Sequence, residues 1–243
     1  MIVRKMHLEL DEMEVDEMEL EEHLAELDIL EKEMDQHSAL MNEAGEWLGL
    51  AFDVAEDLNR FIENMESLFS VFEVIEKSEK GNYFLIGTLW SGVLGAYEGF
   101  VHDLFERLLG KEAYLEHAVK NVPNLSDKDK NYLRLNQKKS IGKVELETQL
   151  RRATLHEPNQ IARLVNILFG ISVPTVCEAQ VERALNIRNA YIHNNGFDQG
   201  TRVEVDLASL KEFHHVIDDL ISHFAYELQR EMNFFLKKNR ENT

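Results

Sequence analysis

"YFLIGTLWSGVLGAYEGFVHDLFERLLG", residues 83–110, decides the fold. Large apolar side chains recur in it at steps of three and four residues, the spacing that covers the sides of an α-helix. They are Leu85, Leu89, Val93, Tyr97, Phe100, Leu104 and Leu108. Glycines interrupt this surface, although each one costs a helix about 1 kcal/mol relative to alanine. These glycines are Gly87, Gly92, Gly95 and Gly99. We therefore expect other helices to pack closely on this one, which ends at Gly110.

The segments that follow also carry helix signals. Ser126 is an N-cap candidate before "DKDKNYLRLNQKK", and Asp206 is one before the last helix. The stretch "TVCEAQVERALNIRNAYIHNNG" has Thr175 as its expected cap and Asn195 and Gly196 as its expected stop. "TRVEVD" alternates like a short strand but has no evident partner strand. The sequence predicts an all-α helical bundle.

Composition limits the class of protein. The chain of 243 residues has 44% hydrophobic residues, 3 Pro and 12 Gly, which fits a globular helical protein. The one cysteine, Cys177, excludes an internal disulfide framework, and we expect it to be a small buried side chain. No uninterrupted apolar run approaches the ~20 residues that span a bilayer, and the start has no signal-peptide pattern. We expect a cytoplasmic protein without a membrane partner.

The acidic charge is concentrated in the first third of the chain. Residues 1–80 hold 24 acidic and 6 basic residues, whereas residues 81–243 hold 21 and 20. Apolar residues also recur there every seven positions, at Met6, Met13, Leu20, Leu27, Met34, Met41, Leu48, Ala55, Ile62 and Phe69. We predict an acidic helical arm over 1–36 and a helical domain over 37–243. The acidic face of the arm is either solvated or covers a basic groove or partner.

Conventional catalytic and metal motifs are absent. The sequence has no phosphate-binding glycine loop, no dinucleotide fingerprint and no HExxH. His214 and His215 precede Asp218 and Asp219, but adjacent helical residues point about 100° apart and form a poor ligand pair. We therefore expect neither a metal nor a cofactor.

An arginine and a histidine five positions apart occur at the end of the helix before Gly196. In "NIRNAYIHNNG", polar Asn189 follows Arg188, and His193 lies just ahead of the stop. The spacing alone is common, because "RRATLH" repeats it with Arg151 and His156. The second match has a basic neighbour and a loop around it, so we interpret it as a surface patch.

The combination of "RNAYIHNNG" with the upstream helix "AYEGFVHDLFERL", inside an all-α chain, resembles the HEPN superfamily. The resemblance covers about residues 80–235. Many members of this superfamily are metal-independent RNases, and others are non-catalytic. The resemblance implies that Arg188, Asn189 and His193 are catalytic, and that the protein is a toxin or defence effector with an antitoxin or regulatory partner. It does not include the acidic arm.

These residue types suit RNA cleavage without a metal. Histidine transfers protons near neutral pH, and arginine offers a bidentate fork to phosphate oxygens. Side chains five positions apart on one helix point about 140° apart, so Arg188 and His193 do not form a tight pair alone. The resemblance implies a homodimer that brings two motifs into one cleft. Tyr191 and Asn194 are supporting candidates, although Tyr191 also suits the core.

A basic track is the candidate RNA surface. It consists of Lys128, Lys130, Arg134, Lys138, Lys139, Lys143, Arg151 and Arg152, and the interleaved Tyr132 could stack on a base. Acidic residues lie among them, so a mixed-charge solvated face is an equal alternative. The function we predict is a metal-independent endoribonuclease that acts by 2′-hydroxyl attack. The alternative is a non-catalytic binding or assembly module whose acidic arm contacts a partner.

Overall fold

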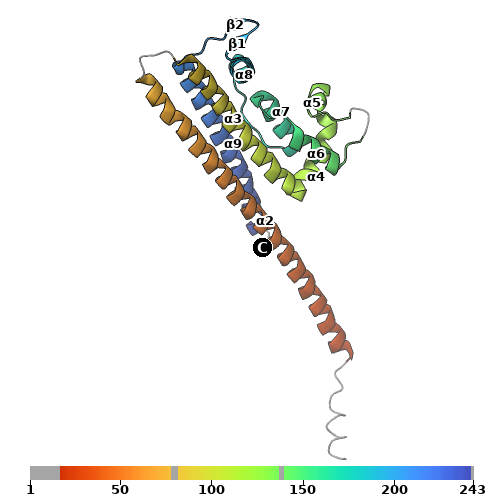
Figure 1. Ribbon diagram of the computed structural model, residues 1–243. Helices are drawn as coiled ribbons and strands as arrows, with labels where there is room; N and C mark the ends of the chain where they lie inside the picture. The colour runs from red at the N-terminus through yellow and green to blue at the C-terminus, as the bar shows by residue number, and fades with distance from the viewer. Residues whose placement is uncertain (1–16, 78–81, 137–139, 242–243) are drawn as a thin grey trace, which may run out of the picture. The chain divides into compact units, whose positions relative to one another are not determined.

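The computed structural model of this protein describes residues 17–77, 82–136 and 140–241 (Figure 1). Almost every element in these residues is helical, which confirms the all-α prediction. The elements are α2 (Glu17–Glu76), α3 (Tyr83–Gly110), α4 (Glu112–Asn121), the 3-10 helix η1 (Val122–Asn124), α5 (Asp127–Tyr132), α6 (Lys143–Arg152), α7 (Pro158–Phe169), α8 (Glu178–His193), β1 (Phe197–Asp198), β2 (Thr201–Arg202) and α9 (Leu207–Glu241).

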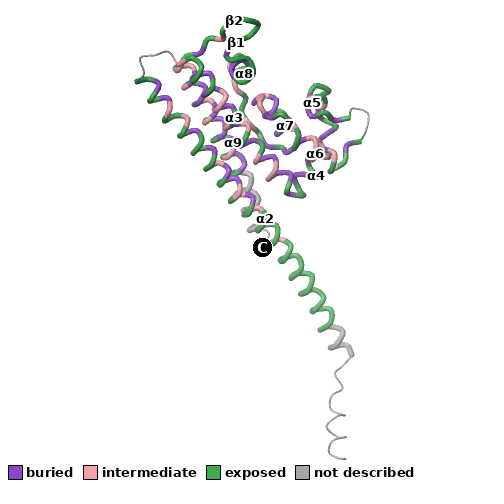
Figure 2. Tube along the Cα trace, in the orientation of Figure 1, coloured by how far each residue is buried: buried purple, intermediate pink, exposed green. Residues whose placement is uncertain are grey.

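The chain divides into two compact units, Met1–Trp47 and Leu48–Thr243. The division therefore comes later in α2 than the boundary at residue 36 that the charge pattern predicts. In the described part of the first unit, the apolar residues with seven-residue spacing are exposed (Figure 2). Leu27 is 60%, Met34 72% and Met41 62% exposed. This stripe is not buried by any other described residue.

The core of the second unit is built around α3, which contacts α8, α9, α4 and α6. Val93, Leu104 and Leu108 on α3 are buried as their three- and four-residue spacing predicts, whereas Leu85 at the start of the pattern is 41% exposed. By length and composition alone α3 could cross a membrane. Half of its most apolar window is buried against other parts of the chain, which is also typical of a core helix.

Glycine allows α3 and α8 to approach closely at one position. A Cβ atom on Gly87 would overlap the ring of Tyr191, so no larger residue fits there without a shift. Gly92 likewise lies close to Leu68, but Gly95 and Gly99 face open space. The prediction of close packing is therefore confirmed for two of the four glycines.

The part of α2 in the second unit packs through a different face from the seven-residue stripe. Phe61, Met65 and Phe72 are buried there. Asp57 is also buried, and its Oδ2 lies 3.2 Å from Nε of Arg107 on α3. An ion pair therefore supplements the apolar contact between α2 and α3.

Most of the predicted helix ends are confirmed. Ser126 forms a capping box with Asp129, the Ser209 amide donates to Asp206 at 2.8 Å, and α3 ends at Gly110. After α8, Asn195 and Gly196 both have positive φ, the left-handed conformation expected at a helix stop.

The predicted start of α8 at Thr175 is wrong. The amide side chain of Asn159 accepts a hydrogen bond from the backbone N–H of Val176 and donates one to its carbonyl, both at 2.8 Å. These bonds hold Val176 outside the helix, so Cys177 becomes the N-cap. Cys177 is exposed, which corrects the prediction that it is buried.

The segment "TRVEVD", predicted as a short strand or extended turn without a partner, forms a strand at Thr201 and Arg202, and this strand has a partner. Thr201 and Arg202 in β2 pair antiparallel with Asp198 and Phe197 in β1. The hairpin directly follows α8, and the hydroxyl of Tyr191 donates to the carbonyl of Val203 at 2.9 Å. The end of α8 is therefore fixed to the segment that leads into α9.

Candidate functional site

Arg188 lies where α8 packs on α3. Its guanidinium Nη2 is 3.5 Å from Oε2 of Glu98, and each side chain is 25% exposed. Glu98 belongs to the helix "AYEGFVHDLFERL", so the two stretches that carry the sequence resemblance contact each other. The carboxylate holds the guanidinium in place and leaves part of it accessible to an anionic ligand.

A histidine approaches the same carboxylate from another element. His156, in the loop between α6 and α7, has its Nδ1 4.0 Å from Oε1 of Glu98. Both atoms are buried, and neither has a hydrogen-bond partner in the described part of the chain. Three residues from distant parts of the sequence, Arg188, Glu98 and His156, thus form one cluster that is only partly satisfied. We call it the Glu98 cluster.

The charge of Glu98 also acts on two tyrosines. Burial raises the pKa of Tyr132 well above its ordinary value, and the carboxylates of Glu157 and Glu98 raise it further. The pKa of Tyr97 is raised by burial first, and then by Tyr132 and Glu98. Both phenols therefore stay protonated at neutral pH and can act only as neutral hydrogen-bond partners.

His193 occupies the last turn of α8 and is exposed. Within the described residues, no hydrogen bond or ion pair involves its ring. Helix α8 runs without interruption from Glu178 to His193, so Arg188 and His193 project about 140° apart. Within one chain, Arg188 therefore points toward α3 and His193 is exposed to solvent.

The other residues predicted around the motif differ in their surroundings. Asn189 is exposed, and Asn194 is the exposed C-cap of α8. Tyr191 is 5% exposed, and its ring packs between Gly87 and Gly196. Its hydroxyl is used by the Val203 carbonyl, so Tyr191 supports the position of α8 from the core.

The predicted RNA-binding residues do not share one environment. Lys143 is paired with Glu112 and Glu116, and Arg151 with Glu106 and Glu147. Tyr132, proposed as a stacking residue, donates its hydroxyl to the Thr154 carbonyl. Arg152 is exposed, while Lys138 and Lys139 lie outside the described residues.

His156 is the residue that sequence reasoning missed. It belongs to the second arginine–histidine match, "RRATLH", which local sequence indicates to be a surface patch. The repeated spacing was the available signal, but the contact with Glu98 spans 58 positions of sequence and follows only from the fold. Arg151 of the same match does not join the cluster and pairs with Glu106 instead.

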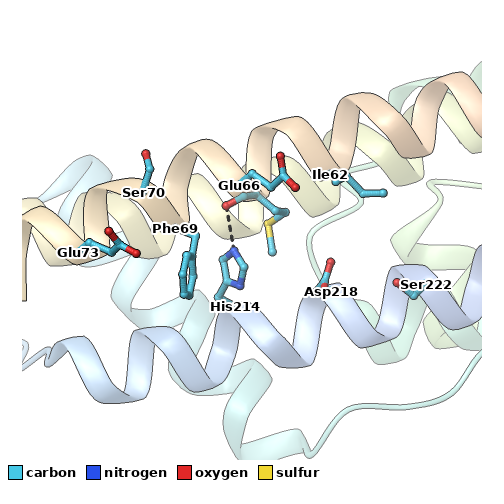
Figure 3. Close-up of a pocket in the computed structure, with 9 residues that line it drawn as sticks. Ile62, Glu66, Phe69, Ser70, Glu73, His214, Asp218 and Ser222 are labelled. Carbon is cyan, nitrogen blue, oxygen red and sulfur yellow. Dashed lines mark hydrogen bonds between the residues drawn. The ribbon is translucent and has the colours of Figure 1, made fainter.

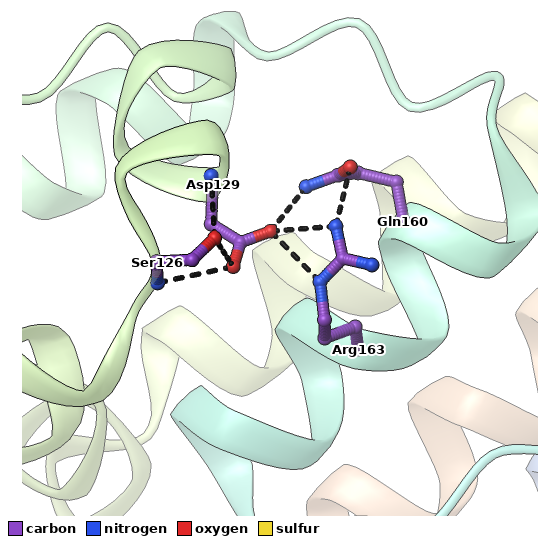
Figure 4. A network of polar contacts seen from close by, with 4 residues as sticks. All are labelled: Ser126, Asp129, Gln160 and Arg163. Carbon is purple, nitrogen blue, oxygen red and sulfur yellow. Dashed lines mark hydrogen bonds and ion pairs between the residues drawn. The ribbon is translucent and has the colours of Figure 1, made fainter.

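In a second carboxylate cluster in the domain, the carboxylate is buried and fully hydrogen-bonded. Asp129 is completely buried and accepts hydrogen bonds from Ser126, Gln160 and Arg163 (Figure 4). Burial alone would raise the pKa of Asp129, but the bonds from Arg163 and Ser126 outweigh it and hold the pKa below its ordinary value. This arrangement ties α5 to α7. We call it the Asp129 network.

A pocket of about 450 Å³ lies between α2 and α9 (Figure 3). His214 lines it, is 7% exposed, and lies with Nε2 3.0 Å from the carbonyl oxygen of Met65. None of the predicted catalytic or RNA-binding residues lines this pocket. Across the described ranges, no group of three or more His, Cys, Asp or Glu side chains could hold a metal ion.

Comparison with known proteins adds nothing to this geometry. No family model matches the chain, and no curated protein or solved structure matches it either. The membership in the HEPN superfamily that the sequence suggests therefore stays a prediction.

Proposed function

We propose that this protein is a metal-independent endoribonuclease that acts as a dimer. The observation that carries the proposal is the contrast along α8 between a positioned arginine and an exposed histidine. Arg188 is held by Glu98 with part of its guanidinium accessible, and His193 is exposed at the end of the same helix. A phosphate anchor and a proton carrier are the two functions that metal-free RNA cleavage needs.

The reaction follows from these two side chains. A histidine takes the proton of the 2′-hydroxyl, and the 2′-oxygen attacks the adjacent phosphorus. The bond from phosphorus to the 5′-oxygen breaks, and the leaving oxygen takes up a proton from a protonated histidine. The products are a 2′,3′-cyclic phosphate and a 5′-hydroxyl. Arg188 stabilises the negative charge that develops on the phosphoryl oxygens, and Asn189 orients the phosphate.

The weakness of the Arg188–Glu98 ion pair is consistent with a phosphate anchor. At 3.5 Å the pair is longer than a charge-assisted hydrogen bond of about 2.7–2.9 Å, so Glu98 holds the guanidinium loosely. A phosphate dianion or phosphodiester can therefore share or replace Glu98 at low cost. A saturated pair would have to be broken before the arginine could bind substrate.

The exposed face of α8 supports the proposed dimer. Ile192 is 53% exposed on the turn that also carries Asn189 and His193. Burial of this side chain favours association, and a two-fold contact along α8 would bring the His193 of each chain toward the other. Such a contact would compensate for the angle of about 140° between Arg188 and His193 within one chain. Mutation of Ile192 to Glu should shift the protein to monomers in sedimentation velocity and reduce cleavage with it.

By analogy with the resemblance, we assign this activity to a toxin or defence effector in the cytoplasm. Its partner would be an antitoxin or another regulatory protein. Expression of the wild type in a host cell should stop growth, and expression of the His193→Ala variant should not.

A second candidate function is a non-catalytic assembly module, favoured by the first unit. Its exposed apolar residues, Leu27, Met34 and Met41, lie on a helix whose charged positions are mainly acidic. A basic amphipathic helix complements both features. This function predicts no RNA turnover and a partner that no longer binds when residues 1–36 are removed or when Leu27 and Met34 are changed to Glu.

Incubation with RNA in EDTA tests the first function against the second. Purified wild type and His193→Ala are incubated with tRNA and with total RNA, and the products are resolved on a denaturing gel. The ribonuclease predicts cleavage by the wild type alone. Absence of cleavage by the wild type, or a strict requirement for added metal, would contradict it.

A further inference from the structure

A small pocket lies at the end of α5, beside α6 and the loop that leads to α7. Its volume is about 130 Å³. Six of its eight lining residues have polar side chains. They include Arg134, Gln149, Arg152 and His156, with Tyr132 and Thr154 at the hydrogen bond between them.

The charge of this pocket differs from that of the protein as a whole. The full chain carries −19, yet the lining residues include two arginines and a histidine and no carboxylate. Nearby cations are neutralised, because Lys143 and Arg151 each pair with two carboxylates. For Arg134 and Arg152, no carboxylate of the described residues lies within ion-pair distance. The positive charge of the pocket is therefore available to a ligand.

We propose that this pocket binds a phosphate group of an RNA strand. Two guanidinium groups offer paired N–H donors that match phosphate oxygens, and the Gln149 amide adds a neutral donor. Recognition of phosphate by the pocket is independent of catalysis. The assignment of that phosphate to RNA rests on the proposed function.

The position of His156 connects the pocket to the Glu98 cluster. His156 lines the pocket, and its Nδ1 lies 4.0 Å from Glu98, which in turn lies 3.5 Å from Arg188. His156 and Glu98 thus link the pocket to Arg188 through two consecutive side-chain contacts. The pocket positions the backbone, and Arg188 receives the phosphate that reacts.

Equilibrium binding of RNA tests the proposal. A 5′-labelled single-stranded RNA is titrated with His193→Ala protein in EDTA, so that cleavage does not deplete it, and fluorescence anisotropy is recorded at several salt concentrations. We expect Arg134→Ala and Arg152→Ala in this background each to weaken binding about tenfold. The steepness of log K against log salt should fall by about one for each arginine that no longer binds a phosphate. Lys120→Ala, an exposed cation on α4, is the matched control and should bind as the parent does.

A titration with inorganic phosphate distinguishes between two ligands for the pocket, a phosphate of RNA and a small phosphorylated molecule. Broadening of the ³¹P resonance by the parent protein, and its absence in the Arg134→Ala/Arg152→Ala double variant, would support a pocket for phosphate. If phosphate binds there but RNA affinity is the same in the double variant, the ligand is a small phosphorylated molecule and the RNA assignment is overturned. Equal weakening by Lys120→Ala would also overturn it, since the effect would then be one of net charge.

The proposal and the proposed function can fail separately. If RNA binds through Arg134 and Arg152 but the wild type does not cut it, the ribonuclease proposal is refuted and the pocket proposal is retained. RNA that is cut by the wild type, with binding unchanged in the double variant, refutes the pocket and leaves the ribonuclease. Both arginines are exposed, so thermal melts of the variants should match that of the parent and serve as the folding control.

Discussion

Two carboxylates in the second unit, Asp129 and Glu98, each contact an arginine from another helix, but they differ in burial and in hydrogen bonding. Asp129 is completely buried and accepts bonds from Ser126, Gln160 and Arg163, with Nε and Nη2 of Arg163 at 2.9 and 2.8 Å. Glu98 is partly exposed, lies 3.5 Å from Arg188, and leaves its Oε1 without a hydrogen bond in the described residues.

The difference separates a structural ion pair from one that can take part in binding. A buried carboxylate with all its hydrogen bonds formed stabilises the folded state. Removal of one partner leaves a buried charge without its counter-charge. A half-buried pair longer than a direct hydrogen bond contributes less to folding, and its arginine can exchange partners. We therefore assign the Asp129 network to stability, and the proposed function assigns substrate binding to the Glu98 cluster.

Exchange of one arginine in each cluster should give the largest contrast. We expect Arg188→Ala to reduce RNA cleavage about 10²- to 10³-fold, because a preorganised charge at the phosphate is removed. Arg163→Ala is the matched variant from the Asp129 network, and it should lower the melting temperature but retain cleavage by the folded protein. Initial rates at a temperature below both melting transitions give the measurement. Equal loss of cleavage in the two variants would remove the distinction.

Removal of the buried charge should have the next largest effect. Asp129→Asn is expected to lower the free energy of unfolding by about 2–3 kcal/mol, since Arg163 and the Ser126 cap lose an ionised acceptor. The loss stays below the range for fully buried pairs because the Arg163 side chain is 43% exposed and can be solvated. Urea unfolding followed by circular dichroism measures it. A midpoint equal to that of the wild type would show that the network does not stabilise the fold.

The same change at the open cluster should be much milder. Glu98→Gln keeps the shape of the side chain and removes its charge beside Arg188 and His156. We expect the free energy of unfolding to change by less than about 1 kcal/mol and the affinity for RNA to rise by up to about fivefold. Anisotropy titration of a labelled RNA and urea unfolding check the two parts. A destabilisation as large as that of Asp129→Asn would place Glu98 in the structural class.

The smallest expected effect is the pH dependence of the Asp129 network. The pKa of Asp129 in the folded protein lies below the ordinary value of 3.8, so its contribution to stability is complete above that value. It is lost as the pH falls through the lower, folded-state pKa. The difference in unfolding free energy between wild type and Asp129→Asn should therefore shrink between about pH 5 and pH 2. A difference that stays constant over this range would exclude the charge as its cause.

Local sequence predicts the elements of this fold better than it predicts the cluster. Ser126, Asp206 and Gly110 act within a few residues of themselves, and each ends or begins a helix as expected. Thr175 fails as a cap because Asn159, sixteen positions away, fixes the backbone of Val176. An interaction between segments overrides the local preference there.

The candidate site shows the same limit more strongly. The motif identifies Arg188 and His193, and the helix period correctly indicates that they point apart. The contacts of Glu98 with Arg188 and His156 depend on how α3, α8 and the loop before α7 pack together. No spacing in the sequence specifies that arrangement, so the second arginine–histidine match resembles an ordinary surface patch until the fold is known.

Cleavage of RNA in the presence of EDTA by wild type, Arg188→Ala, His193→Ala and Arg163→Ala tests the central claim most directly. We predict cleavage by the wild type and by Arg163→Ala, with products that end in 2′,3′-cyclic phosphate, and none above background by the other two. Cleavage that survives both Arg188→Ala and His193→Ala, or an inactive wild type, would contradict the assignment of α8 as the catalytic element.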